Sequence, residues 1–383
     1  MFFCITSSMT ILLRFYHQNA IAMLKLKLLS LLILLLFACK KEKPAGDNEP
    51  EVMSDCGDIT SNTGFPSVVP GWEVALFETG QKYYWSWRPY FLNEMVGFIF
   101  ESNGHVFKTI DGGNSWKQVL HTNQAAPNSM FFVNEENGFL CAQNLTGCPN
   151  NCEGKMTIYR TKDGGEIWQK IVHDKEGSIL DIYFSDTLNG IGTVLIPSQG
   201  YRQGVVRTSN GGHSWEVEPL PTLDGLTTFQ MQMVDSVNGF FAGADGILYR
   251  TEDGGATFDS LQTPLEQIYN VSFFDAVHGL ASDFNKTYRT ADGGNTWELV
   301  CKRSSTLLHL SGPNEVLSIQ VAHKCVDYDV LMHDAGFFVS NDGGATWKES
   351  ELAQNFGIAR HHFPSPNIGF GMYGSKLVKF KKQ

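Results

Sequence analysis

The chain alternates short apolar runs with polar turns along most of its length, and the pattern repeats. Each unit has an apolar run, a polar turn, and a glycine followed by an aromatic or aliphatic residue. The copies are FLNEMVGF at 91–98, FVNEENGF at 132–139, MVDSVNGF at 233–240, FDAVHGL at 274–280 and FPSPNIGF at 363–370. Short runs bounded by turn residues are typical of β-strands joined in hairpins. We therefore expect an all-β fold.

A second motif, a basic residue followed by Thr-x-Asp-Gly-Gly-x-x-Trp, recurs with small variations. Its acidic or amide positions are Asp111, Asp163, Asn210, Asp253, Asp292 and Asp342, and its aromatic positions are Trp116, Trp168, Trp215, Phe258, Trp297 and Trp347. The Asp or Asn side chain can accept hydrogen bonds from backbone N–H groups in a turn. Paired glycines can adopt positive φ, and the aromatic residue can begin a strand and bury its ring. We expect these residues to be structural.

The spacing of the motif predicts a β-propeller. With Trp72 as a further marker, the aromatic positions are separated by 39 to 52 residues. Periods of about 40–50 residues with four short strands each are typical of propeller blades. We expect seven four-stranded blades, with the strand at 70–77 completing a last blade whose other strands lie within 360–383. Such ring closure would leave no free sheet edge at the termini.

These motifs resemble the Asp-box, or BNR, repeats of sialidases and other secreted propellers. The fuller unit, Phe-x-Asp-x-x-x-Gly-Phe followed by Arg-Thr-x-Asp-Gly-Gly-x-Thr-Trp, is especially similar to the photosystem II stability and assembly factor family, over residues 70–383. The resemblance implies a propeller in which the boxes are scaffold. It also implies that an arginine-bearing surface binds a protein partner.

The N-terminal region predicts export and a lipid anchor. Lys25 and Lys27 precede an apolar run from Leu28 to Phe37, which is shorter than the roughly 20 residues of a membrane-spanning helix and fits a signal peptide. Leu36-Phe37-Ala38-Cys39 resembles a bacterial lipobox. We expect residues 1–38 to be a signal peptide, with Met23 as an alternative start, Cys39 to be lipidated, and residues 39–68 to form a flexible tether before the propeller at 69–383. The expected location is the outer membrane, facing the periplasm or the cell surface; an ordinary secretory signal is the alternative.

Composition narrows the function classes. The 383 residues are 42% hydrophobic and 18% charged, which is ordinary for a folded protein, and the net charge is −11. This acidic balance argues against nucleic acid as a partner. The sequence contains no glycine-rich phosphate loop leading into a helix and no histidine or cysteine spacing typical of a metal site. We therefore expect no cofactor and no metal.

Candidate binding residues lie in loops that share one face of a propeller. The loop around 79–89 is rich in aromatics, and four arginines fall in loops of this kind. The candidates are Trp85, Trp87, Arg88, Arg202, Arg303 and Arg360. Aromatic and arginine side chains could anchor a protein or stack on a sugar. The alternative is that the aromatics pack over the seam between blades.

The favoured function is a non-catalytic binding or assembly scaffold for a protein or glycan. The alternative is a glycoside hydrolase, sialidase-like or other. The Arg-Ile-Pro motif that sialidases carry near the N-terminus is absent, and no spacing of loop acids marks a catalytic pair. Whether the chain is an enzyme stays open, with the balance against it.

Six cysteines remain after the expected lipidation of Cys39 and removal of the signal. An even number in an exported chain favours disulfides. We expect Cys148 to pair with Cys152, four positions further along in CPNNC, and consider a Cys301–Cys325 pair plausible.

Overall fold

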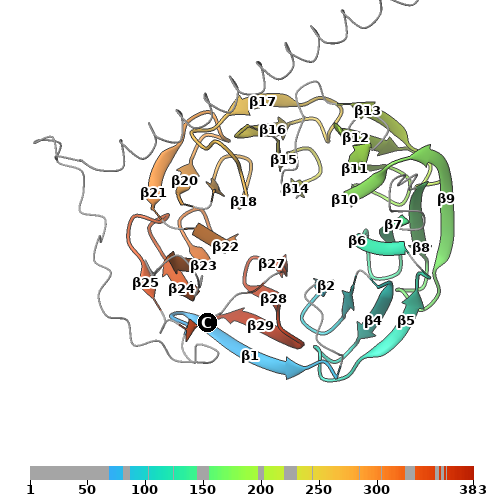
Figure 1. Cartoon of the computed structure of the whole chain (residues 1–383), viewed down its shortest axis with the longest axis horizontal. Coiled ribbons are helices and arrows are strands. Elements are labelled where there is room, and N and C mark those ends of the chain that lie inside the picture. The colour runs from blue at the N-terminus through green and yellow to red at the C-terminus, as the bar shows by residue number, and fades with distance from the viewer. Residues whose placement is uncertain are drawn as a thin grey trace, which may run out of the picture. The chain divides into compact units, whose positions relative to one another are not determined.

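In the computed structural model, the described residues form a seven-bladed propeller around a central channel (Figure 1). The structure describes residues 69–80, 87–101, 103–123, 125–144, 155–196, 202–219, 231–243, 245–283, 285–302, 304–323, 333–349, 353–354, 358 and 360–383. The predicted signal peptide, the lipidation at Cys39 and the tether lie outside these residues.

Each blade is an antiparallel sheet whose strands run from the channel to the rim. The innermost strands are β2 (Arg88–Phe91), β6 (Ala125–Phe132), β10 (Ser178–Phe184), β14 (Met231–Met233), β18 (Asn270–Phe273), β22 (Ser304–Leu310) and β27 (His361–Ser365). The second strands are β3 (Gly97–Phe100), β7 (Gly138–Asn144), β11 (Gly190–Ile196), β15 (Gly239–Ala242), β19 (Gly279–Ser282), β23 (Val316–His323) and β28 (Ile368–Tyr373).

The outer half of each blade follows the same plan. The third strands are β4 (His105–Thr109), β8 (Lys155–Thr161), β12 (Arg202–Thr208), β16 (Ile247–Thr251), β20 (Thr287–Thr290), β24 (His333–Ser340) and β29 (Lys376–Lys382). The rim strands are β5 (Lys117–His121), β9 (Gln169–Glu176), β13 (Glu216–Pro219), β17 (Asp259–Gln262), β21 (Glu298–Cys301), β25 (Lys348–Glu349) and β1 (Trp72–Glu78). The sixth blade also contains β26 (Ala353–Gln354), which pairs with β24. The prediction of seven blades is confirmed.

The N-terminal strand closes the ring as expected. β1 pairs with β29 along its whole length, from Trp72 opposite Lys382 to Glu78 opposite Lys376. The three other strands of that blade come from the C-terminal end of the chain. Residues more than 290 positions apart therefore share one sheet, and the two ends of the described chain meet where the Gln383 N–H donates to the Gly71 carbonyl over 3.0 Å.

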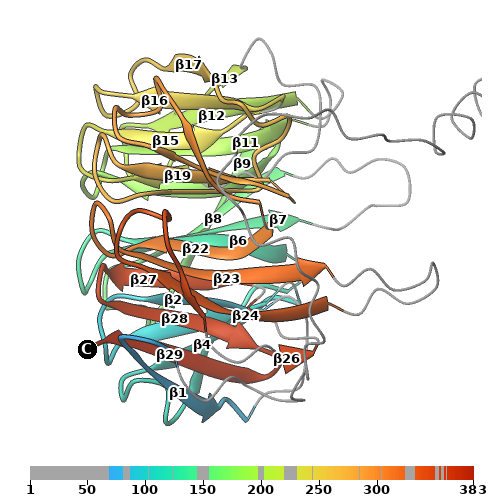
Figure 2. The ribbon, with the colours of Figure 1, turned by 90° about the vertical axis from the view of Figure 1, so that its left-hand side faces the viewer.

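Strand direction gives the propeller two different faces, seen edge-on in Figure 2. One face, here called the box face, carries the hairpins between first and second strands and the Asp-boxes between third and fourth strands. Hydrogen bonds join these two turns in each of the first six blades; in blade 1, the Gly112 N–H donates to the Met95 carbonyl over 2.9 Å. The opposite face, here called the loop face, carries the connections between blades. The innermost strands begin at the loop face.

The core consists of seven apolar clusters distributed around the ring. Stacked phenylalanines join neighbouring blades in these clusters: Phe91 lies on Phe370 with ring centroids 3.5 Å apart, and Phe240 lies on Phe273 at the same separation. Both rings of each pair are almost fully buried. This repeated packing holds the innermost strands at a constant spacing around the channel.

Candidate functional site

The central channel is a cavity lined by both polar and apolar side chains. It has a volume of about 780 Å³ and is lined by residues of all seven innermost strands or of the positions just before them. Its lining includes Arg88, Asp181, Asn270, Arg360 and several histidines, with Met231 and Phe131 among the apolar members. A cavity of this size, whose wall combines apolar surface with convergent polar groups, is typical of a binding site.

Two arginines stand near the loop-face mouth of this channel. Arg88 opens β2, and Arg360 immediately precedes β27 in the neighbouring blade. The Arg88 guanidinium donates to the carbonyl of Asn128 on the next blade, which fixes its direction. Burial and then the charge of Arg360 lower the pKa of Arg88 to about 10. Burial also lowers the pKa of Arg360, although its side chain is exposed at the mouth. Both side chains therefore stay cationic at neutral pH.

Asp181 is the one carboxylate among the described residues that line the channel. Its Oδ1 accepts from the Ser129 hydroxyl over 2.5 Å and from its neighbour's amide, Ile182 N, over 3.0 Å, while its Oδ2 accepts from the Met231 N–H over 3.0 Å. Burial raises the pKa of Asp181 to about 6, against the lowering effect of these bonds and of Arg88. The carboxylate thus joins blades 2, 3 and 4 along the channel wall.

Side chains that cross from one blade to the next complete the wall. The Phe132 N–H donates to the Tyr90 hydroxyl over 2.9 Å, and the Phe91 N–H donates to Nδ1 of His362 over 3.2 Å. The Gln232 side chain both donates and accepts across the blades. Its amide nitrogen donates to the Phe273 carbonyl and its oxygen accepts from the Phe273 N–H, each over 2.8 Å. These bonds satisfy backbone groups on inner strand edges that would otherwise face the channel unpaired.

The channel histidines do not add positive charge at neutral pH. Burial is the main cause that lowers the pKa of His309 to about 3, that of His361 to about 4 and that of His362 to about 3. The Nε2–H of His309 donates to the Pro366 carbonyl over 2.9 Å, and a neutral ring that carries its proton on Nε2 makes this bond. The positive potential of the channel therefore comes from Arg88 and Arg360.

The predicted binding residues differ in their positions and burial. Arg88 and Arg360 lie together at the channel mouth. Trp87 is only 3% exposed and packs in the cluster of Phe91, Ile99 and Phe370, with its ring centroid 5.9 Å from that of Phe107. This favours the alternative interpretation for Trp87, packing over the seam between blades. Trp85, Arg303 and the Arg202 side chain lie outside the described residues.

Sequence reasoning missed Asp181, Tyr90 and His362, although a signal was available. Five polar residues stand nine positions before a hairpin glycine: Arg88, Ser129, Asp181, Asn270 and Arg360 precede Gly97, Gly138, Gly190, Gly279 and Gly369. A polar position at a fixed offset in otherwise apolar strands indicates one level of the channel. Aligning the hairpins, instead of the boxes, would have grouped these residues.

Of the predicted disulfide residues, the structure describes only Cys301. Cys301 is buried, and its sulfur lies 3.6 Å from Oε1 of Gln320 as a hydrogen-bond donor. Cys148, Cys152 and Cys325 lie outside the described residues, so both pairings stay predictions. Cys141, another of the six cysteines, is a buried free thiol that donates to the Ser129 carbonyl over 3.4 Å.

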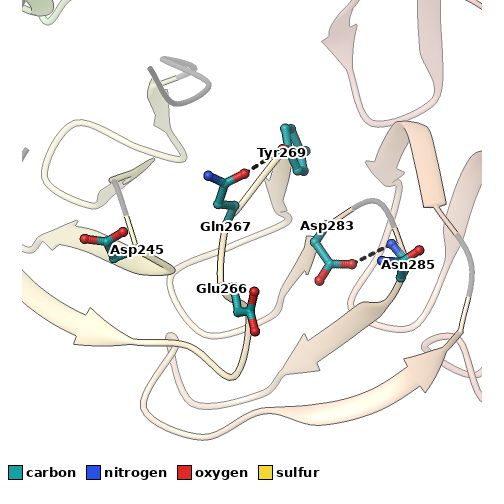
Figure 3. A pocket seen from close by; sticks show the side chains of 6 residues that line it. All are labelled: Asp245, Glu266, Gln267, Tyr269, Asp283 and Asn285. Carbon is teal, nitrogen blue, oxygen red and sulfur yellow. Dashed lines mark hydrogen bonds between the residues drawn. The ribbon is translucent and has the colours of Figure 1, made fainter. Parts of the chain in front are cut away.

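A second cavity, of about 410 Å³, opens between blades 4 and 5 and is shown in Figure 3. Three carboxylates line it, those of Asp245, Glu266 and Asp283, each from a different turn or loop. Tyr269 lines both this cavity and the channel, and its hydroxyl donates to Oε1 of Gln267 over 2.6 Å. Across the described parts of the chain, no group of three or more His, Cys, Asp or Glu side chains is placed to hold a metal ion.

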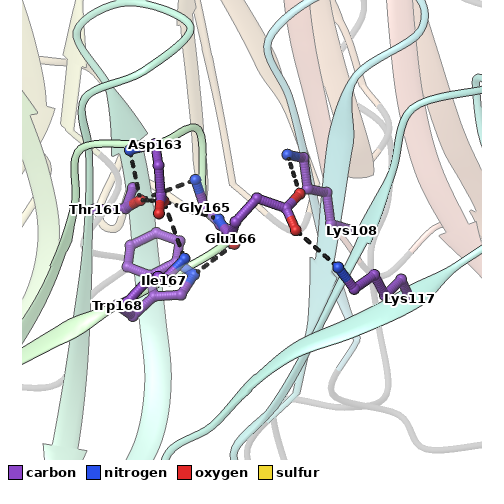
Figure 4. A network of polar contacts seen from close by, with 8 residues as sticks. All are labelled: Lys108, Lys117, Thr161, Asp163, Gly165, Glu166, Ile167 and Trp168. Carbon is purple, nitrogen blue, oxygen red and sulfur yellow. Dashed lines mark hydrogen bonds and ion pairs between the residues drawn. The ribbon is translucent and has the colours of Figure 1, made fainter.

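The box residues make the contacts that a turn-stabilising motif needs, as Figure 4 shows for blade 2. Oδ1 of Asp163 accepts from the Thr161 hydroxyl over 2.7 Å and from the Ile167 N–H over 3.0 Å, and the Trp168 indole donates to the Gly165 carbonyl over 3.0 Å. Asn210 makes the equivalent bonds in blade 3. Both glycines of every box have positive φ, for example +71° at Gly164. These contacts lie on the box face, away from the mouth that carries Arg88.

Comparisons with known proteins point to two kinds of propeller. The family model described as photosynthesis system II assembly factor YCF48 matches residues 167–306. A photosystem II assembly lipoprotein Ycf48 of Synechococcus sp. is 28% identical over 141 residues, which is 34% of this chain and 39% of that protein. A xyloglucanase of Paenibacillus sp. is 28% identical over 210 residues, which is 50% of this chain and 19% of that protein. The matches thus span less than half the length of these relatives.

Solved structures give the same fold. A structure of YCF48 bound to a D1 peptide superposes with a TM-score of 0.58 at 19% identity, covering 84% of this chain and 100% of that chain. The GH74 xyloglucanase from Xanthomonas campestris superposes with a TM-score of 0.56 at 9% identity, covering 79% of this chain and 53% of that chain. Together with the six boxes, these matches identify the chain as a BNR-repeat β-propeller that is similar to the YCF48 assembly factors.

Proposed function

We propose that this protein is a lipid-anchored scaffold of the cell envelope that binds a protein partner at the loop-face mouth of its channel. The lipobox ending at Cys39 supports the anchor, with the outer membrane as the expected location. The relative whose structure is described as bound to a D1 peptide supports a polypeptide as the kind of ligand. The residues that line the channel mouth indicate the charge that a partner of this chain should carry.

The pair Arg88 and Arg360 carries the proposal. Among the described residues, neither guanidinium forms an ion pair with a carboxylate, and Asp181 already accepts three hydrogen bonds from other groups. Two neighbouring cations without a carboxylate partner favour an anionic ligand, because arginine binds carboxylates through paired N–H groups. An acidic side chain or a chain terminus of a partner protein would supply that charge.

The non-catalytic part of the proposal rests on the carboxylates. Glycoside hydrolysis by the usual mechanism needs two carboxyl groups flanking the bond to be broken. The described lining of the channel offers Asp181 alone, and that side chain is committed to Ser129 and the amides of Ile182 and Met231. A binding role needs no second carboxylate.

A glycosidase remains the second candidate because of two observations. The xyloglucanase match covers half of this chain, and the acidic cavity of Figure 3 offers three carboxylates beside Tyr269. The same cavity and channel could hold a glycan without cleaving it. Release of sugars from a panel of plant and bacterial glycans, abolished by Glu266→Gln, would establish this candidate and contradict the non-catalytic proposal.

The proposal is tested by capture of partners from solubilised envelope fractions. The wild type should retain a defined protein, and the Arg88→Gln/Arg360→Gln double variant should lose it, because both charge-assisted contacts are removed. Lys348→Gln is the matched control, since Lys348 is an exposed cation on the rim strand β25. Equal retention by all three proteins would contradict a binding role for the arginine pair.

A further inference from the structure

The box face carries exposed apolar side chains in several of its hairpins and boxes. Three of them belong to neighbouring corners of blades 1 and 2: Met95 is 50% exposed, Ile110 is 68% exposed and Ile167 is 73% exposed. Met95 lies in the first hairpin, Ile110 in the first box and Ile167 in the second box. Isolated exposed apolar residues are ordinary on protein surfaces, so their grouping has to be shown.

Direct contacts bring these three corners together. The Gly112 N–H of the first box donates to the Met95 carbonyl over 2.9 Å, which places Met95 beside the box that contains Ile110. Glu166 of the second box pairs with Lys108 over 2.7 Å and with Lys117 over 2.8 Å, both in blade 1, as Figure 4 shows. Ile167 is the next residue after Glu166.

Two exposed lysines belong to the same two boxes or follow them directly in the sequence. Lys117 is 74% exposed, and Lys162 is exposed within the second box. We call Met95, Ile110, Ile167, Lys117 and Lys162 the docking patch. Two acidic side chains beside the patch form ion pairs with lysines. Glu166 pairs with Lys108 and Lys117, and Glu94 pairs with Lys379 and Lys381 over 2.8 and 3.1 Å. In blade 2 the position equivalent to Met95 is Glu136, which bounds the patch on that side.

The described chain enters the propeller on this same face, in blade 7. β1 begins at Trp72, opposite Lys382, at the box-face end of blade 7. Blade 7 is joined to blade 1 by the ion pairs of Glu94 with Lys379 and Lys381. The described chain therefore begins on the box face, in the blade that neighbours the docking patch.

We infer that the docking patch rests on the lipid bilayer to which the chain is tethered. This builds on the proposed anchor at Cys39. A tether of about 30 residues allows an end-to-end distance on the order of 30 Å and keeps the patch at a high effective concentration near the bilayer. A weak contact is then sufficient: isoleucine and methionine side chains enter the interface, and lysine ammoniums reach the headgroup phosphates.

This arrangement has a consequence for the channel. Arg88 and Arg360 stand at the loop-face mouth, on the opposite side of the propeller from the docking patch. With the box face on lipid, the arginine pair would open toward the aqueous compartment. A soluble partner, or the extramembrane part of a membrane protein, could then reach it without competing with the bilayer.

The test replaces the native anchor, so that it does not depend on lipidation. All strands of the described residues lie between Trp72 and Lys382 and the ring closes within them, so residues 40–383 retain the whole described fold. This form would carry a polyhistidine tag in place of Cys39 and be bound to phosphatidylcholine–phosphatidylethanolamine vesicles containing a nickel-chelating lipid. Lysine acetylation by an N-hydroxysuccinimide ester is then followed residue by residue by mass spectrometry, on vesicles and in solution.

Lys117 and Lys162 should react about fivefold more slowly on vesicles. Lys286, which is exposed in the turn between β19 and β20 on the loop face, should react equally in both states. Ile110→Ser/Ile167→Ser should restore the reactivity of both lysines on vesicles. Val172→Ser is the matched control, because Val172 is 53% exposed within the rim strand β9, away from the turns of the box face. It should change nothing. Equal reactivity of Lys117 and Lys162 in both states would overturn the inference, and partner capture by Arg88 and Arg360 would be unaffected by that result.

Discussion

The ring of Phe184 lies flat on the ring of Phe139 from the preceding blade, with centroids 3.6 Å apart and planes 3° from parallel. A β-carbon on Gly190 would overlap the ring of Phe184, so the glycine makes room for the aromatic residue at the end of its own hairpin. The residue after a hairpin glycine, such as Phe139, stacks on the next blade. The Gly-aromatic step thus serves packing within a blade and between blades.

Replacement of Gly190 by alanine should destabilise the propeller by about 1–3 kcal/mol, the usual cost of forcing extra volume into a packed core. Urea unfolding followed by far-UV circular dichroism measures this. The second substitution Phe184→Leu should recover part of the loss in the Gly190→Ala background, because it removes the ring that the methyl group meets. An unchanged unfolding midpoint for Gly190→Ala would show that the ring can move aside.

The repeat made the blades predictable, since boxes and hairpin glycines recur with every sheet. Blade number, strand order and ring closure by β1 all followed from that periodicity. The reason for the hairpin glycine could not be predicted from that periodicity, because it depends on a contact between Gly190 and Phe184 that no local sequence pattern shows. The sequence thus predicts the positions of the turns more readily than the side chains that pack against the turn glycines.

The box carboxylates should make stability depend on acid. The Thr257 hydroxyl and amide lower the pKa of Asp253 to about 2, below its value in an unfolded chain. Its stabilising contribution is therefore present above about pH 4 and is lost as the pH falls toward 2. Asp253→Asn should lower Tm by only about 1–2 °C at pH 7, because the site is solvent-exposed and Asn210 fills the same role in blade 3. This gap in Tm should close by pH 2, and a gap that stays constant with pH would contradict the argument.

The contribution of Asp181 to stability should depend on pH in the opposite direction to that of Asp253. Burial raises its pKa to about 6, above the unfolded value, so its contribution is most favourable below about pH 4 and declines as the pH rises through 6. The difference in unfolding free energy between wild type and Asp181→Asn should therefore fall by up to about 2–3 kcal/mol between pH 4 and pH 7. Urea unfolding at several pH values measures it. A difference independent of pH would show that Asp181 titrates normally.

The site was only partly predictable, for a physical reason. Arg88 and Arg360 were found because arginines are uncommon in this chain and stood near predicted loops. Their closeness depends on ring closure, which brings blade 7 against blade 1. Asp181 was missed because a single carboxylate within an apolar strand gives no spacing signal of its own. Trp87 shows the opposite error. The sequence places it near a predicted loop, but its side chain is buried in the core.

The hydrogen bond from the Phe132 N–H to the Tyr90 hydroxyl should matter for the rigidity of the channel wall. Tyr90→Phe keeps the ring, which lies over that of Phe132 with centroids 6.1 Å apart, but leaves the amide without its acceptor. An unsatisfied amide of this kind costs about 1–3 kcal/mol, and faster hydrogen exchange at Phe132 should accompany it. Tyr183→Phe is the matched control, because the Tyr183 hydroxyl has no hydrogen bond to a described residue although its ring also lines the channel. If both variants were equally stable and exchanged equally at Phe132, the cross-blade bond would contribute nothing, and the wall would be held by the stacked phenylalanines alone.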